Sequence, residues 1–155
     1  MMNRAIPAST QSGVGLIEVL VAVLVLSIAF LGIAALQAMS MSTNNSAMAR
    51  SMATIDSYSI LDAMRADLVS AKSASYNGTV TANACPTGTG TLANAQLTQW
   101  CAQLGHDLGA TASTTGVISC SGSGECTVTI TFDDSRAGAG AASSSSQQII
   151  TKAIL

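Results

Sequence analysis

The chain has 155 residues, of which 9% are charged and 48% are hydrophobic, and its formal net charge is −2 at pH 7. No basic patch accompanies this slightly acidic balance, so nucleic acid is not expected as a partner. One Trp, two Tyr and two Phe provide only a small core for one domain, and small exported domains often compensate with disulfides.

Residues 1–13 are predicted to form a short polar leader, and residues 14–37 a membrane-spanning helix. Residues 19–36 contain no charged side chain. At ~1.5 Å per helical residue they span ~27 Å, close to the ~30 Å hydrocarbon core of a bilayer. Arg4 precedes the span and no basic residue follows it before Arg50, which predicts a cytoplasmic amino terminus and places the rest of the chain outside.

Glu18 is a single carboxylate at the amino-terminal edge of this apolar run. An acid deep in hydrocarbon costs ~2.5–3.5 kcal/mol on insertion scales, so its position needs a reason. One interpretation is that Glu18 lies in the lipid headgroups and marks where the span begins. The other interpretation comes from its neighbours, because Gly13 and four uncharged residues precede it and the apolar helix follows it.

This order of glycine, spacer, acid and apolar run resembles the processing site of type IV prepilins. The resemblance implies that a prepilin peptidase cuts between Gly13 and Val14 and methylates the new amino group of Val14. Glu18 is then the fifth residue of the mature chain. Cleavable secretory signals are cut after their apolar region, whereas here the apolar helix stays on the mature protein.

Residues 38–74 are predicted to continue the helix as an amphipathic segment, since they contain neither proline nor glycine. Apolar side chains recur there at spacings of three and four, which predicts one stripe packed in the core: Met48, Met52, Ile55, Tyr58, Leu61, Met64 and Leu68. We therefore expect one helix over residues 14–73, ended by the turn signal at Asn77 and Gly78.

A long helix followed by a small domain is the outline of type IV pilins, so the resemblance implies an α+β, pilin-like fold. Residues 13–37 and 62–66 resemble the minor pilin family called PilV, the type IV pilus modification proteins. Many major pilins carry a proline midway along the apolar helix, where this chain has Ala35. That difference favours a minor pilin or a pseudopilin over a major subunit.

Residues 75–155 are predicted to form the small globular domain, beginning with a surface loop over residues 75–95. A short helix follows, with one apolar face and an end at Gly105 or Gly109; the face comprises Leu97, Trp100, Cys101, Leu104 and Leu108. Trp100 is expected to pack this helix onto the domain.

Three segments near the carboxyl end predict an antiparallel sheet. Residues 127–132 alternate strictly, which places Val128, Ile130 and Phe132 on the core face and the threonines in solvent. A hairpin connection with two glycines joins this strand to residues 117–118. Residues 133–147 are predicted to form a loop. Residues 148–155 are predicted to form a final strand, at an edge where Lys152 discourages further pairing; Lys152 is the one charged side chain in that segment.

Four cysteines allow three connectivities. We expect Cys85–Cys101 and Cys120–Cys126, since each pair closes a short local loop and the second clips the predicted hairpin. A zinc site would show paired Cys-x-x-Cys spacings, which this sequence lacks.

His106 is the one histidine, and it is not expected to act in catalysis or metal binding. Asp107 adjoins it, but neighbouring residues on a helix point to different faces. No triad, carboxylate pair or phosphate-binding glycine loop is recognisable, so we expect no enzymatic activity and no cofactor.

The resemblance implies a minor pilin of a type IV pilus, a structural subunit that contributes to pilus assembly, twitching motility and adhesion. Its partners would be the prepilin peptidase, other pilins and minor pilins, and the inner-membrane assembly platform. It would lie in the bacterial inner membrane as a single-pass protein with a periplasmic domain, and later in the extracellular pilus. Alternatives are a pseudopilin of a type II secretion system, a receptor module at the pilus tip and a membrane-tethered enzyme.

Overall fold

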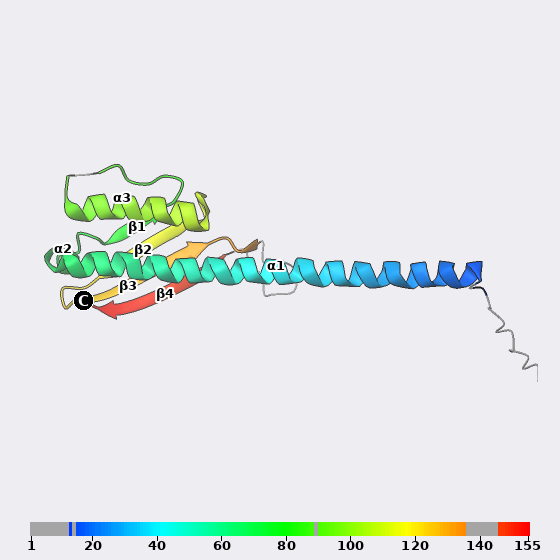
Figure 1. Ribbon diagram of the computed structural model, residues 1–155. Coiled ribbons are helices and arrows are strands. Elements are labelled where there is room, and N and C mark those ends of the chain that lie inside the picture. The colour runs from blue at the N-terminus through cyan, green and yellow to red at the C-terminus, as the bar shows by residue number, and fades with distance from the viewer. Residues whose placement is uncertain (1–12, 14, 89, 136–145) are drawn as a thin grey trace, which may run out of the picture. The chain divides into compact units, whose positions relative to one another are not determined.

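The computed structural model describes residues 13, 15–88, 90–135 and 146–155 (Figure 1). The chain divides into two compact units, Met1–Ala38 and Met39–Leu155. Helix α1, Leu16–Ala66, supplies the described helical residues of the first unit and continues into the second. The other helices and the sheet all belong to the second unit.

The long helix ends earlier than predicted. It stops at Ala66, and a short helix α2, Leu68–Lys72, follows after one non-helical residue. That residue, Asp67, has φ −128° and ψ 56°, outside the helical region. Its carboxylate accepts a hydrogen bond from the hydroxyl of buried Tyr76 at 3.2 Å, so a contact with a residue further along the chain accompanies the interruption.

The predicted core stripe of α1 is only half right. Leu61 and Met64 are buried in the core and Met52 is half-buried, but four of the predicted residues are exposed: Met48 by 60%, Ile55 by 55%, Tyr58 by 53% and Leu68 by 40%. The buried positions include small or polar side chains instead, namely Ser46, Ala53, Asp56 and Ser57. The apolar residues of this segment therefore belong to two faces of the helix, of which only one packs on the domain.

The sheet has four antiparallel strands in the order β1-β2-β3-β4. The strands are β1, Gly78–Thr81; β2, Thr115–Cys120; β3, Glu125–Phe132; and β4, Gln147–Ile154. Strands β2, β3 and β4 confirm the three predicted segments, with β4 at one edge. Strand β1 lies inside the predicted loop over residues 75–95, and its four residues are too short a signal for alternation to be recognised.

Helix α3, Leu92–Leu104, begins at Thr91, whose hydroxyl accepts a hydrogen bond from the Asn94 amide at 3.2 Å. It starts five residues before the first predicted apolar position. The α-helical part ends where Gly105 was predicted to end it, and a π-helical turn η1, Gly105–Gly109, continues the chain to the second predicted glycine. Gly109 has φ +101°, a backbone conformation that favours glycine.

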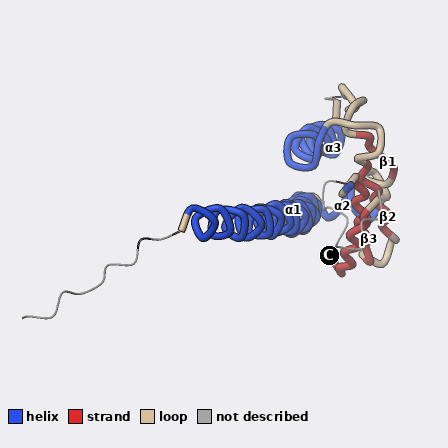
Figure 2. Tube along the Cα trace, turned by 90° about the vertical axis from the view of Figure 1, so that its right-hand side faces the viewer, coloured by secondary structure: helices blue, strands red, loops and turns tan. Residues whose placement is uncertain are grey.

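The core of the second unit lies between the helices and one face of the sheet. Figures 1 and 2 show α3 and the second half of α1 on the same side of the strands. Val128, Ile130 and Phe132 of β3 are buried there, as the alternation predicts. The molecule is thus an α+β protein with a long apolar amino-terminal helix and a small antiparallel sheet.

Candidate functional site: the long helix and the seam beside it

The start of the long helix lies next to the predicted cleavage point. Gly13 is exposed, and the helix begins three residues later at Leu16. Val14, the predicted methylation site, and residues 1–12 of the predicted leader lie outside the described residues. The structure therefore shows Gly13 three residues ahead of a helix, and cleavage and methylation stay predictions.

Glu18 lies in the first turn of α1, and its backbone amide donates to the Gly15 carbonyl at 2.9 Å. Its side chain is exposed and has no hydrogen bond or ion pair with the described part of the chain. The amino-terminal end of a helix carries partial positive charge, which favours a carboxylate there. Glu18 is thus an acid on the surface of an otherwise apolar segment, and it is available to a partner.

Between Glu18 and Gln37, the first half of α1 is apolar apart from the hydroxyl of Ser27. All its residues from Leu16 to Ser40 are exposed, and the helix is long and apolar enough to cross a membrane. Ser27 donates its hydroxyl proton to the Val23 carbonyl at 2.7 Å. Such a bond within the helix satisfies a hydroxyl group that has no water nearby.

A second apolar face continues along α1 in the second unit. Met41, Met48 and Ile55 follow one another at intervals of seven residues and are exposed by 68%, 60% and 55%. Seven residues are close to two helical turns, so these side chains lie along one line of the helix surface. We call Met41, Met48, Ile55 and the half-exposed Tyr58 the outer stripe. It is separate from the face that packs on the sheet.

Trp100 joins α3 to the buried face of α1, opposite the outer stripe. It is 3% exposed, and its indole Nε1 donates to the backbone carbonyl of Asp56 at 3.0 Å. Gly116 of β2 makes room for the ring, because a Cβ atom there would lie 2.4 Å from Trp100 Cη2. This confirms Trp100 as the residue that packs the helix onto the domain. The requirement for a glycine opposite it is visible only in the structure.

Asp56 lies in the same seam between α1 and α3, and no sequence pattern singles it out. The residue has no exposed surface, and neither carboxylate oxygen has a hydrogen-bond partner among the described residues. The pKa of Asp56 is raised to about 6, chiefly because the carboxylate is buried and also because the negative charge of Asp107 lies nearby; the Gln103 amide partly opposes this rise. Hydrophobic periodicity along α1 does not reveal a buried acid, because what buries Asp56 is the packing of another element against the helix.

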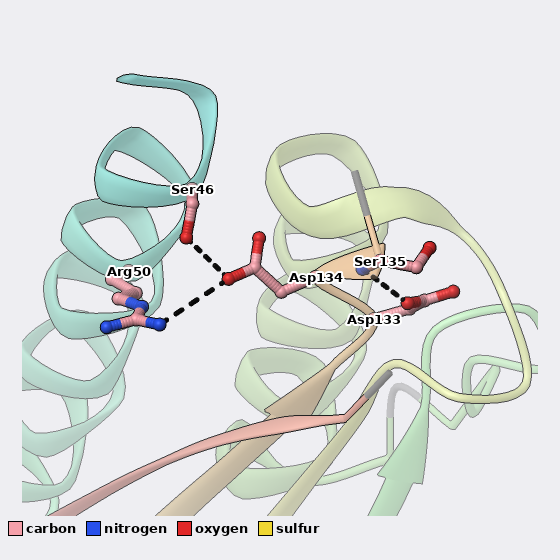
Figure 3. Close-up of polar contacts among 5 residues, drawn as sticks. All are labelled: Ser46, Arg50, Asp133, Asp134 and Ser135. Atoms are coloured by element: carbon pink, nitrogen blue, oxygen red, sulfur yellow. Dashed lines mark hydrogen bonds and ion pairs between the residues drawn. The ribbon is translucent and has the colours of Figure 1, made fainter. Parts of the chain in front are cut away.

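A second buried acid, Asp134, attaches the end of β3 to α1 (Figure 3). Its Oδ2 accepts a hydrogen bond from the Ser46 hydroxyl at 2.5 Å and lies 3.6 Å from Nη2 of Arg50. The neighbouring Asp133 accepts from the backbone amide of Ser135 at 2.8 Å, which shapes the turn. Unlike Asp56, Asp134 has both a donor and a cation beside it.

Both predicted disulfides are present, and their connectivity is confirmed. Cys85–Cys101 ties the segment after β1 to α3, and Cys120–Cys126 joins β2 to β3 at residues that face each other in the ladder. The turn between them contains Gly124 with φ +92°, as a glycine-containing hairpin requires. Short loops between cysteines were therefore a sufficient guide to the pairing.

His106 and Asp107 contact each other, contrary to the expectation that they face apart. Nδ1 of His106 lies 2.6 Å from Oδ1 of Asp107, within the π-helical turn rather than an α-helix. The His106 side chain is 88% exposed. Across the described residues, no group of three or more His, Cys, Asp or Glu side chains is arranged to hold a metal ion.

Comparison of the chain with protein-family models, with curated proteins and with solved structures finds no match.

Proposed function

We propose that this chain is a minor pilin, a structural subunit of a type IV pilus. The observation that carries the proposal is the long helix: its first half is apolar and exposed on every side, with Gly13 and Glu18 at its start. Its second half holds a small disulfide-linked domain. This is the arrangement of the type IV pilins that the processing motif resembles.

The physical reason lies in what can cover the first half of α1. An apolar helix surface without a protein partner needs lipid or other apolar helices around it. A subunit held in the inner membrane can exchange lipid for neighbouring helices when it enters a fibre. Glu18 then leaves the headgroup region and needs a positive partner, which we assign to the methylated amine of Val14 on the next subunit. Charge pairing of this kind fixes register more than it adds stability.

The outer stripe supports the same proposal. Met41, Met48, Ile55 and Tyr58 remain exposed in the second unit although they are apolar or aromatic. In a fibre they would meet the helices of neighbouring pilins, which explains why apolar side chains occupy two faces of one helix. A pseudopilin of a type II secretion system shares all these features, so a motility defect rather than a secretion defect would separate the two.

Processing in the membrane and entry into the pilus would require three kinds of partner: the prepilin peptidase, the inner-membrane assembly platform and other pilins. The domain would face the periplasm first and the cell exterior later. Disulfides form and persist in such oxidising compartments, which fits the two bridges seen here.

Processing at Gly13 tests the proposal. The full-length chain should be produced with an active prepilin peptidase and, as a control, with a catalytically inactive one. Mass spectrometry should find an N-terminal methylated Val14 only with the active enzyme. A chain that keeps residues 1–13 in the presence of active peptidase would overturn the proposed function.

A further inference from the structure

Asp56 has an unusual environment for a charged side chain. Its carboxylate is fully buried and neither oxygen has a hydrogen-bond partner among the described residues. Buried carboxylates are normally paired or hydrogen-bonded, because an isolated buried charge is costly. The Trp100 indole donates to the backbone carbonyl of Asp56 and not to its side chain. The Gln103 amide lies close enough to favour the ionised form, but it completes no hydrogen bond to either oxygen.

No described cation is placed to compensate Asp56. Helix α3 has no charged residue. In η1 the charged groups are Asp107, which opposes ionisation of Asp56, and His106, which is paired with Asp107. On α1 itself, Arg50 is engaged by Asp134.

The sheet adds no compensating charge either. Its charged side chains, Glu125 and Lys152, are both exposed. They alternate along their strands with the residues that face the helices. The charges that Asp56 experiences therefore come from the seam itself.

A proton is the ligand that fits this position. The two oxygens have no accessible surface, so a metal ion or an amine could reach them only after the seam had opened. Protonation removes the charge and gives the carboxyl a hydrogen to donate. Burial and Asp107 both favour the protonated form, and they raise the pKa of Asp56 to about 6.

We propose that the seam between α1 and the α3–η1 segment is a pH-dependent latch, closed when Asp56 carries a proton and loosened when Asp56 is ionised. Ionisation brings a second negative charge next to Asp107 and requires water to enter the seam. This inference goes beyond the proposed function and does not depend on it. An exported domain would, however, meet the changes of external pH to which such a latch responds.

The fold limits the motion to one end of the seam. Cys101 is bonded to Cys85, and Trp100 is packed against Gly116, so this part of α3 is held in place. Beyond it, Gln103 and the η1 turn lie beside Asp56. A cavity of about 430 Å³ next to η1, lined in part by Asp107, leaves space for that turn to move.

Hydrogen exchange on the full-length chain in detergent micelles tests the latch. Amide protection of residues 103–109, corrected for the intrinsic effect of pH on exchange, should be measured from pH 4 to pH 7. One proton linked to opening changes protection by up to about tenfold per pH unit. Between about pH 4 and pH 6 the wild type should therefore lose on the order of 100-fold protection in this segment.

Asp56→Asn mimics the protonated carboxyl, so it should keep the low-pH protection at every pH. Asp62→Asn, which removes an exposed carboxylate paired with Arg65, is the matched control and should behave as wild type. Histidines can also change charge in this range, so His106→Gln should retain the wild-type profile if Asp56 is the sensor.

Asp107→Asn gives a second readout that does not alter Asp56 itself. It removes a charge that raises the pKa of Asp56, so the loss of protection should move to lower pH. The latch is wrong if Asp56→Asn retains the wild-type pH dependence, or if Asp107→Asn leaves the midpoint unchanged. It is also wrong if added Ca²⁺ at pH 7 restores protection as fully as acid does, because a metal ion would then be the ligand.

Discussion

A single buried residue, Asp56, should control how the stability of the domain depends on pH. Its pKa is raised from 3.8 to about 6 in the folded chain. An acid whose pKa is higher in the folded state than in the unfolded state stabilises the fold fully below the unfolded pKa, here near 4. That contribution to the free energy of unfolding is lost as the pH rises to about 6. Above that range both states are ionised and the cost stays constant, at about 3 kcal/mol for a shift of this size.

Asp56→Asn should therefore be more stable than wild type by up to ~3 kcal/mol at pH 7 and nearly equal to it at pH 4. Trp100, the one tryptophan, is buried in the same seam, so its fluorescence reports unfolding by urea directly. A variant less stable than wild type at pH 7 would show that the ionised carboxylate has a favourable partner after all.

At the scale of elements, the close contact between α3 and β2 depends on Gly116, because any larger residue there would collide with α3. A Cβ at residue 116 would lie 2.4 Å from Trp100 Cη2 and 2.9 Å from Leu104 Cδ1. Gly116→Ala should thus destabilise the domain by ~1–3 kcal/mol, the usual cost of overpacking a core. Gly122→Ala, whose added Cβ would meet only the Lys72 carbonyl at 4.0 Å, should unfold at the wild-type urea concentration. Equal midpoints for both variants would contradict this packing.

The elements also show where sequence reasoning succeeds and where it stops. Strand β3 and the two disulfides follow from alternation and short spacing, which are local signals. Three residues of the outer stripe, Met48, Ile55 and Tyr58, were wrongly predicted to lie in the core. Periodicity identifies an apolar face of a helix, but it does not tell which of two such faces another element covers. The roles of Asp56, Gly116 and Asp134 were missed because each role depends on a contact with a residue far away in the sequence. Trp100 contacts both Asp56 and Gly116, and Ser46, which binds Asp134, precedes it by 88 positions.

At the scale of the whole molecule, the two units differ in whether their apolar residues are covered by the chain itself. The second unit has its own buried core and two disulfides. The described part of the first unit is an exposed apolar helix that begins beside Glu18. A membrane would cover that helix without any need for Glu18. A fibre of packed subunits would cover it and also give Glu18 a specific partner.

Glu18→Ala is the variant that separates these two situations. The peptidase should still cleave the variant, because Gly13 and the apolar helix remain, and the helix should still insert into the membrane. Assembly should fail, since the amine of the neighbouring Val14 would stay unpaired in a water-poor core, a cost of ~3–5 kcal/mol. Glu125→Ala, which removes an exposed carboxylate from β3, is the control and should assemble normally.

The direct measurement is the amount of each variant in pili sheared from cells that also produce the rest of the assembly system, compared with the amount in the membrane. The account predicts that Glu18→Ala is cleaved and present in the membrane but absent from the sheared fraction, whereas Glu125→Ala is present in both. Glu18→Ala at wild-type level in sheared pili would show that Glu18 only marks the membrane edge, and would contradict its role in assembly.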